Sequence, residues 1–145
     1  MAKGASGLAG GSSEVQATGI NWSDARSKVS DAFAGKGTEK QVAFATNVVE
    51  NAYYALEDIE RENTVFVKMN DGKVVGYSKD ATDIYGNKRT DNIEAVKEYK
   101  GQIDQIVDAV KTNKLTISRL LDRRDFLDRN SIKENVRKYA KSKRK

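Results

Sequence analysis

The sequence predicts a predominantly helical α+β domain with about five helices and one small β-hairpin at about residues 64–78. Apolar residues recur at helical spacing in several segments, and this spacing gives way to short β-branched runs around Asn70-Asp71-Gly72. A length of 145 residues suits one hydrophobic core. We therefore expect a flexible Gly/Ser/Ala-rich tail over residues 1–21, one domain over residues 22–140 and a basic disordered tail over residues 141–145.

The first predicted helix begins after Ser23, a residue type that caps helix N-termini well. Gly35-Lys36-Gly37 ends it, and its inner face carries Val29, Ala32 and Phe33. Trp22 precedes the predicted cap, where we expect it to pack the start of the helix onto the core.

The second predicted helix is the most clearly marked element. Thr38 and Gln41 form a capping-box pair, and the helix is expected to run to about Arg61. Its apolar positions form two rows, which favours a central helix covered on more than one side. The main row contains Val42, Ala45, Val49, Ala52, Tyr53, Leu56 and Ile59.

The predicted hairpin consists of two β-branched or aromatic runs that flank Asn70-Asp71-Gly72. Asp-Gly between such runs is a strong hairpin signal. The polar stretch from residue 78 to residue 90 then reads as a surface loop, with Ile84 and Tyr85 as possible anchors to the core.

Three further helices are predicted after this loop. The third begins near Asp91, which forms a capping-box-like pair with Glu94. The fourth is capped by Thr116, and the fifth begins at a capping box formed by Ser131 and Glu134. All three carry apolar residues at helical spacing.

The chain contains no cysteine and no histidine. Disulfides, thiolate nucleophiles, imidazole relays and metal sites that need sulfur or nitrogen ligands are therefore excluded. We expect no cofactor and no metal. The start of the chain lacks the basic and apolar regions of a secretory signal, and no apolar run approaches the length of a membrane span, so a cytoplasmic protein without membrane contact is expected.

Charge is distributed unevenly. Residues 114–145 contain 12 Lys or Arg and 4 acidic residues, which gives this segment a net charge of +8, while the rest of the chain totals −3. A basic end on a near-neutral body indicates nucleic acid, or an acidic protein or nucleoprotein, as the partner. The candidate contact residues are Arg119, Arg123, Arg124, Arg129, Lys133, Arg137, Lys138 and Lys141.

The alternative for these basic residues is a solvated helical face. Asp122, Asp125 and Asp128 are interleaved with them, and salt bridges to these acids would serve solubility alone. The sequence leaves both interpretations open.

Enzymatic activity has one weak candidate, a carboxylate-metal nuclease that uses Asp91, Glu98 and Lys100. All three fall on one predicted helix, where Glu98 and Lys100 point in different directions, so we expect a protein that is not an enzyme. The acidic cluster Glu57, Asp58, Glu60 and Glu62 is expected to be solvated surface charge.

Residues 116–139 loosely resemble the two helices of a helix-turn-helix DNA-binding motif. They depart from that motif between Arg124 and Arg129, where the usual glycine-containing turn is replaced by what looks like continued helix.

Residues 37–45, Gly-Thr-Glu-Lys-Gln followed by apolar and aromatic residues, resemble a helix opening of uncharacterised proteins from phages and other mobile elements. The resemblance implies a source and assigns no functional residue. In that setting a small basic protein would bind the element's DNA, assemble into a particle, or block a host defence complex such as a CRISPR effector. These three hypotheses predict, respectively, salt-dependent nucleic-acid binding, self-association, and a tight complex with a host protein.

Overall fold

The computed structural model describes residues 18–64, 66–68, 74–77 and 82–143. Its elements are helices α1 (Trp22–Phe33), α2 (Glu39–Asn63), α3 (Arg89–Lys111), α4 (Ile117–Asp122) and α5 (Arg129–Ser142), strands β1 (Phe66–Lys68) and β2 (Val74–Tyr77), and the 3₁₀ helix η1 (Arg124–Leu127). The predicted, predominantly helical character is confirmed.

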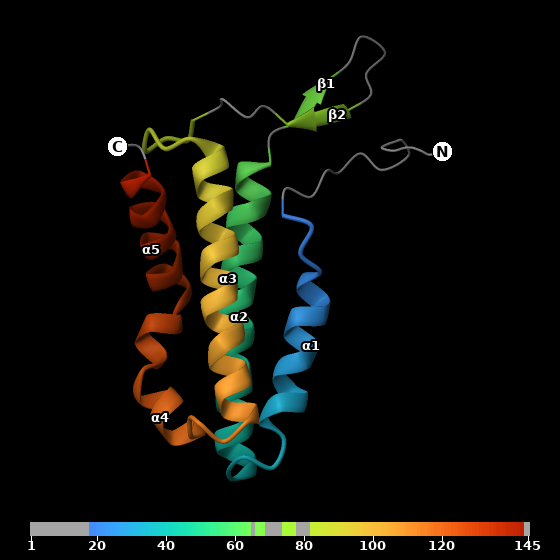
Figure 1. Cartoon of the computed structure of the whole chain (residues 1–145), viewed down its shortest axis with the longest axis vertical. Helices are drawn as coiled ribbons and strands as arrows, with labels where there is room; N and C mark the ends of the chain where they lie inside the picture. Colours follow the sequence, from blue (N-terminus) through green and yellow to red (C-terminus); the bar gives the residue numbers. More distant parts are fainter. Residues whose placement is uncertain (1–17, 65, 69–73, 78–81, 144–145) are drawn as a thin grey trace.

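The helices form an elongated bundle. Figure 1 shows α2 and α3 side by side along its length, α1 on one flank, and α4 followed by α5 on the other. The second helix contacts α1, α3, α4, η1 and α5, as expected for a central helix. Its buried side chains include Val49, Ala52, Tyr53 and Leu56, which lie in the core with Phe33 of α1, Ile103 of α3 and Val136 of α5.

Two helix starts agree with their predicted caps. The Thr38 hydroxyl accepts a hydrogen bond from the Gln41 backbone N–H at 3.1 Å, and the Gln41 side chain accepts one from the Thr38 N–H at 3.0 Å. The Thr116 hydroxyl accepts a hydrogen bond from the Arg119 N–H at 3.2 Å at the start of α4. In both cases one capping residue directly precedes the apolar stripe, so the sequence offers no competitor.

The other three predicted starts are wrong by two or three residues. The cap of α1 is Asn21, whose side chain accepts from the Asp24 N–H at 3.0 Å, so Trp22 is the first residue of the helix and its ring lies in the core. Asp128 caps α5 by accepting from the Ser131 N–H at 3.2 Å, so Ser131 lies inside the helix. Each of these two helices has two candidate capping residues, Asn21 and Ser23 for α1 and Asp128 and Ser131 for α5. The earlier residue is the cap in both, because a helix that starts there buries more of its apolar residues.

Helix α3 begins at Arg89, after Lys88, and no side chain caps it. Asp91 is therefore a first-turn residue, where its negative charge still stabilises the helix N-terminus.

The expectation of continued helix between Arg124 and Arg129 is also wrong, because η1 ends at Leu127 and Asp128 adopts an extended conformation before α5. Figure 1 shows α5 rising along the flank of the bundle from α4 at its foot.

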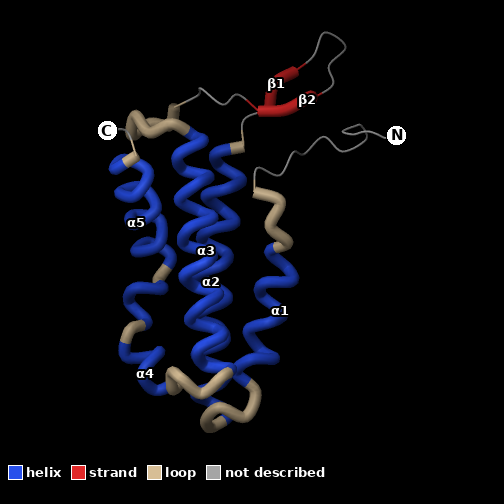
Figure 2. The backbone as a smooth tube through the Cα atoms, in the orientation of Figure 1, coloured by secondary structure: helices blue, strands red, loops and turns tan. Residues whose placement is uncertain are grey.

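The strands β1 and β2 are antiparallel, with Phe66 opposite Tyr77, Val67 opposite Gly76 and Lys68 opposite Val74. Figure 2 shows them beyond the end of the helices. The predicted turn at Asn70-Asp71-Gly72 lies outside the described residues. A closed hairpin over residues 64–78 therefore stays a prediction.

Candidate binding surfaces

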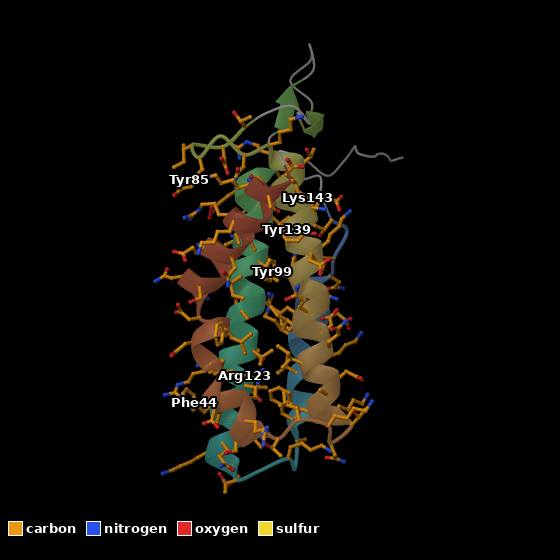
Figure 3. The ribbon with its side chains drawn as sticks, turned by 60° about the vertical axis from the view of Figure 1, so that its left-hand side comes forward. Phe44, Tyr85, Tyr99, Arg123, Tyr139 and Lys143 are labelled. Carbon is orange, nitrogen blue, oxygen red and sulfur yellow. The ribbon has the colours of Figure 1, made fainter. Side chains whose placement is uncertain are left out.

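The eight predicted contact residues are spread along one flank of the bundle. Arg119 lies on α4, Arg123 and Arg124 lie at the junction with η1, and the other five, Arg129, Lys133, Arg137, Lys138 and Lys141, lie on α5. Figure 3 labels Arg123 near the foot of the bundle and Lys143, just after α5, near its opposite end. The structure thus places these residues on a long surface and does not gather them into one site.

The middle of this surface is paired with α2. The Arg129 guanidinium lies 3.5 Å from Asp58 Oδ2, and Lys133 Nζ lies 3.8 Å from Glu62 Oε1. Arg129 also lies over the Tyr54 ring, with 5.5 Å between its guanidinium carbon and the ring centroid. Both pairs are spaced by four residues, so successive turns of α5 meet successive turns of α2.

The two ends of the surface are less engaged. Arg119, Arg123 and Lys141 are exposed, and no carboxylate of the described chain lies within ion-pair distance of them. Arg124 donates a hydrogen bond to the Leu121 carbonyl at 2.8 Å, and Lys138 pairs with Glu134 one turn away at 3.2 Å.

Two aromatic rings are exposed at the foot of the bundle. Phe44 of α2 is 48% exposed and Phe126 of η1 is 69% exposed. The guanidinium carbon of Arg124 lies 5.8 Å from the centroid of the Phe44 ring. This end therefore offers apolar rings beside basic groups. We name it the aromatic end.

The opposite end contains a pocket of about 290 Å³ between α2, α3 and α5, which we name the α2–α3–α5 pocket. This pocket was not predicted from the sequence. Its lining consists of Ile59, Glu62, Asn63, Asp83, Ile84, Tyr85, Arg89, Asn92, Lys133, Val136 and Arg137.

Buried asparagines form the inner wall of the α2–α3–α5 pocket. Asn92 Nδ2 donates to Asn63 Oδ1 at 2.7 Å and to Asp83 Oδ2 at 2.9 Å, while Asn63 Nδ2 donates to the Ile59 carbonyl at 2.8 Å. Asn63 stands four residues after Ile59, and Asn92 four residues before Val96. Each amide therefore continues the apolar stripe of its helix. This position could have indicated the network from the sequence, because a buried amide needs hydrogen-bond partners.

Asp83 remains a carboxylate in this setting. Burial raises its pKa, but hydrogen bonds from Asn92 and from the backbone N–H groups of Asn87 and Tyr85, together with the charge of Arg89, outweigh burial and lower the pKa below its ordinary value. The backbone donors lie at 2.8 Å (Tyr85) and 3.0 Å (Asn87) from Asp83 Oδ1. These bonds fold the segment before α3 into a tight turn that forms one wall of the pocket.

Basic and aromatic side chains form the outer wall of the pocket. Arg89 Nη1 donates to the Glu62 carbonyl at 2.7 Å, and the guanidinium carbon of Arg137 lies 4.1 Å from the centroid of the Tyr85 ring. Tyr85 is 52% exposed. The expectation that Ile84 anchors this loop to the core is wrong, because Ile84 is 90% exposed.

The expectation of solvated surface charge is wrong for Glu60. Its carboxylate is buried and accepts hydrogen bonds from the Trp22 indole N–H and the Thr18 backbone N–H, both at 2.6 Å. Glu57 is half-buried and pairs with Arg26 of α1 at 2.6 Å. A buried indole N–H needs a hydrogen-bond acceptor, so the predicted burial of Trp22 could have indicated that a nearby carboxylate is buried with it.

The residues of the nuclease hypothesis do not converge. Glu98 accepts a hydrogen bond from Gln102 at 3.2 Å, Lys100 pairs with Asp104 at 2.7 Å, and Asp91 lies in the first turn of the same helix. Within the described ranges, no group of three or more carboxylates could hold a metal ion. None of the helices described is long and apolar enough to cross a membrane.

Comparison with known proteins adds no relative. No protein-family model, no curated protein sequence and no solved structure matches this chain.

Proposed function

We propose that the chain is a binding protein without enzymatic activity, which contacts the phosphate backbone of a nucleic acid through the basic residues of α4 and α5. Helix α5 carries five basic residues and one acidic residue, Glu134. Basic groups along a helix neutralise phosphates and release the counterions condensed on them, which supplies binding without sequence readout.

The observation that carries this proposal is the exposure of Arg119, Arg123 and Lys141 without an acidic partner in the described chain. A basic side chain held by a carboxylate must lose that partner before it neutralises a phosphate. Among the described residues these three have no such partner to lose, so they are ready to bind a polyanion.

The middle of the surface can join them. The contacts of Arg129 with Asp58 and of Lys133 with Glu62, at 3.5 and 3.8 Å, are long for ion pairs, and all four side chains are partly exposed to solvent. Such pairs stabilise a fold little, so exchange of a carboxylate for a phosphate costs little.

The test is fluorescence anisotropy of labelled single- and double-stranded DNA and RNA, titrated with the full chain at several salt concentrations. In one variant Arg119, Arg123 and Lys141 are all replaced by Gln. The matched control replaces Lys28, Lys97 and Lys111, exposed residues of α1 and α3, by Gln and so removes the same charge elsewhere.

We expect salt-dependent binding by the full chain, with the first variant weaker by roughly 100-fold at low salt and the control weaker by less than about threefold. The slope of log affinity against log salt should fall by about three in the first variant. Equal weakening in both variants would mean that net charge alone drives binding, and the proposed surface would be wrong.

A second candidate function is a protein-interaction module, as expected of a phage-derived inhibitor of a host defence complex or of a particle component. The aromatic end favours it, because exposed Phe44 and Phe126 beside Arg124 are the residue types that dominate protein interfaces. In this case replacement of Phe126 by Ala abolishes a protein complex or self-association while binding to bare nucleic acid stays absent. Metal-dependent cleavage of DNA by the purified chain would instead revive the nuclease hypothesis.

A further inference from the structure

We infer that the α2–α3–α5 pocket binds the phosphate monoester of a nucleotide and that the Tyr85 ring stacks on its base. This inference rests on the proposed function and deepens it, because it names the end of a nucleic-acid strand as the part that enters the pocket. The site consists of Arg89, Lys133 and Arg137 around the phosphate, with Tyr85 beside it.

Three cationic side chains from two helices converge on this pocket, Arg89 from α3 and Lys133 and Arg137 from α5. Arg89 uses Nη1 for the Glu62 carbonyl at 2.7 Å, and its Nη2 has no hydrogen-bond partner in the part of the chain that the structure describes. A guanidinium with a vacant donor beside a second guanidinium and an ammonium is the arrangement that recognises phosphate oxygens.

The two acids of the lining do not prevent anion binding. Asp83 accepts hydrogen bonds from the Asn92 side-chain amide and from the backbone N–H groups of Tyr85 and Asn87, so its carboxylate oxygens are already satisfied within the wall by neutral donors. The side chain of Glu62 is 64% exposed and lies 3.8 Å from Lys133, so a bound phosphate can replace it as the partner of that ammonium.

The charge of the pocket favours the end of a strand over its interior. A phosphate monoester carries between one and two negative charges at neutral pH, because its second pKa is about 6, whereas each internal phosphodiester carries one. The pocket volume of about 290 Å³ lies near the lower limit of small-molecule sites, so it fits one nucleotide rather than a chain.

Tyr85 supplies a surface for the base. Arg137 covers the ring at 4.1 Å, and 52% of the residue remains exposed at the mouth of the pocket. Aromatic rings at such positions bind nucleobases by stacking, which tolerates any base because every base has a π-face. The site is therefore expected to select the phosphate and the strand end, with little preference among bases.

The first measurement is isothermal titration calorimetry of the full chain with adenosine 5′-monophosphate, inorganic phosphate and adenosine. We expect saturable binding of the monophosphate, with the other two each weaker by roughly tenfold or more. Tyr85→Ala and Arg137→Gln should each weaken binding of the monophosphate by roughly tenfold, and Glu62→Gln should strengthen it by a few-fold. These residues serve better than Arg89, whose bond to the Glu62 carbonyl also holds the fold.

The matched control is Lys97→Gln, which removes the same charge as Arg137→Gln from an exposed position of α3, outside both the pocket lining and the basic surface. Its affinity for the monophosphate should stay within about twofold of the unmodified chain. Absence of saturable monophosphate binding, or equal binding by the unmodified chain, Tyr85→Ala and Arg137→Gln, would overturn the inference. Circular dichroism of each variant confirms that the helices are retained.

A second measurement separates this inference from the proposed function. Single-stranded oligonucleotides with a 5′-phosphate, a 3′-phosphate or two hydroxyl ends are compared by anisotropy, and we expect tighter binding of a phosphorylated end, abolished by Arg137→Gln. Equal binding of all three by the unmodified chain overturns the inference and leaves the proposed function standing. Binding of the monophosphate without binding of any oligonucleotide overturns the proposed function and leaves a nucleotide pocket.

Discussion

The acidic cluster near the end of α2, Glu57, Asp58, Glu60 and Glu62, has two sides that differ in burial and in hydrogen-bond partners. Glu57 and Glu60 face α1, where they are half-buried or buried and accept short bonds of 2.6 Å from Arg26, Trp22 and Thr18. Asp58 and Glu62 face α5, where they lie 3.5 and 3.8 Å from more exposed basic groups. Four carboxylates within six residues thus separate into two that fix the fold and two that loosely hold the basic surface.

The difference follows from burial. A carboxylate removed from water must keep its hydrogen bonds, and losing them costs its desolvation energy as well as the bonds. A carboxylate on the surface exchanges one partner for water or another ion at little cost. The α1 side is therefore part of the folded core, whereas the α5 side consists of partly exposed ion pairs, which the proposed function expects a polyanion to replace.

The largest expected effect is the loss of the Glu60 carboxylate. Glu60→Ala leaves the Trp22 indole and the Thr18 N–H without an acceptor, and we expect a loss of about 3 kcal/mol of unfolding free energy. Chemical denaturation followed by circular dichroism measures it. The matched variant Glu62→Ala should lose under about 1 kcal/mol, since that side chain is largely exposed. Similar losses in the two variants would contradict the distinction between the two sides.

A smaller effect is expected from shortening the N-terminus. The sequence predicted a flexible tail over residues 1–21, but the Thr18 backbone N–H donates to Glu60 and Ile20 packs against the core. Removal of residues 1–20 should lower the unfolding free energy by about 2 kcal/mol. Removal of residues 1–17 should leave it unchanged, because both contacts remain. Thermal melts of the two shortened chains and the full chain test this prediction. If all three melt at the same temperature, residues 18–20 do not contribute to the stability of the fold.

The sequence predicted the helices well because their apolar stripes are long and periodic. Val29, Val49 and Leu56 were assigned to buried faces from spacing alone. Helix starts were predicted only where one capping residue was available, as at Thr38 and Thr116. Where Asn21 competed with Ser23, or Asp128 with Ser131, the choice depended on which start buries the apolar residues, and local sequence does not contain that information.

The candidate sites were predicted only in part. Charge density identified the basic surface, but it gave no means to separate Arg129 from Arg123, because the partner of Arg129, Asp58, lies 71 residues earlier in the chain. The pocket was not predicted at all. Its walls come from three segments that meet only in the folded bundle. The hydrogen bond between Asn63 and Asn92 cannot be predicted without knowing that α2 and α3 pack together.

Loss of the two carboxylates that face α5 should increase nucleic-acid binding. In the double variant Asp58→Asn and Glu62→Gln, Arg129 and Lys133 lose their carboxylates and become available to phosphates. We expect nucleic-acid affinity at low salt to rise by roughly tenfold, with a change in unfolding free energy below about 1 kcal/mol. Anisotropy and denaturation measure the two quantities. The control variant Asp31→Asn and Glu39→Gln removes the same charge at positions on α1 and α2 that form no ion pair with α5 in the described chain. An equal rise in affinity in this variant would show a general charge effect.

The smallest expected effect concerns Asp83, a third kind of carboxylate that stabilises the wall of the pocket. Its pKa is lower in the folded chain than the ordinary value of 3.8, because hydrogen bonds from Asn92, Asn87 and Tyr85 and the charge of Arg89 outweigh burial. A lowered folded pKa means that the ionised group stabilises the fold above pH 3.8 and that this contribution is lost as the pH falls through the folded value. Asp83→Asn should therefore melt below the unmodified chain at pH 7, and the difference should shrink towards pH 3. Melts across this range measure the difference, and one that stays constant with pH would show that Asp83 acts through its shape rather than its charge.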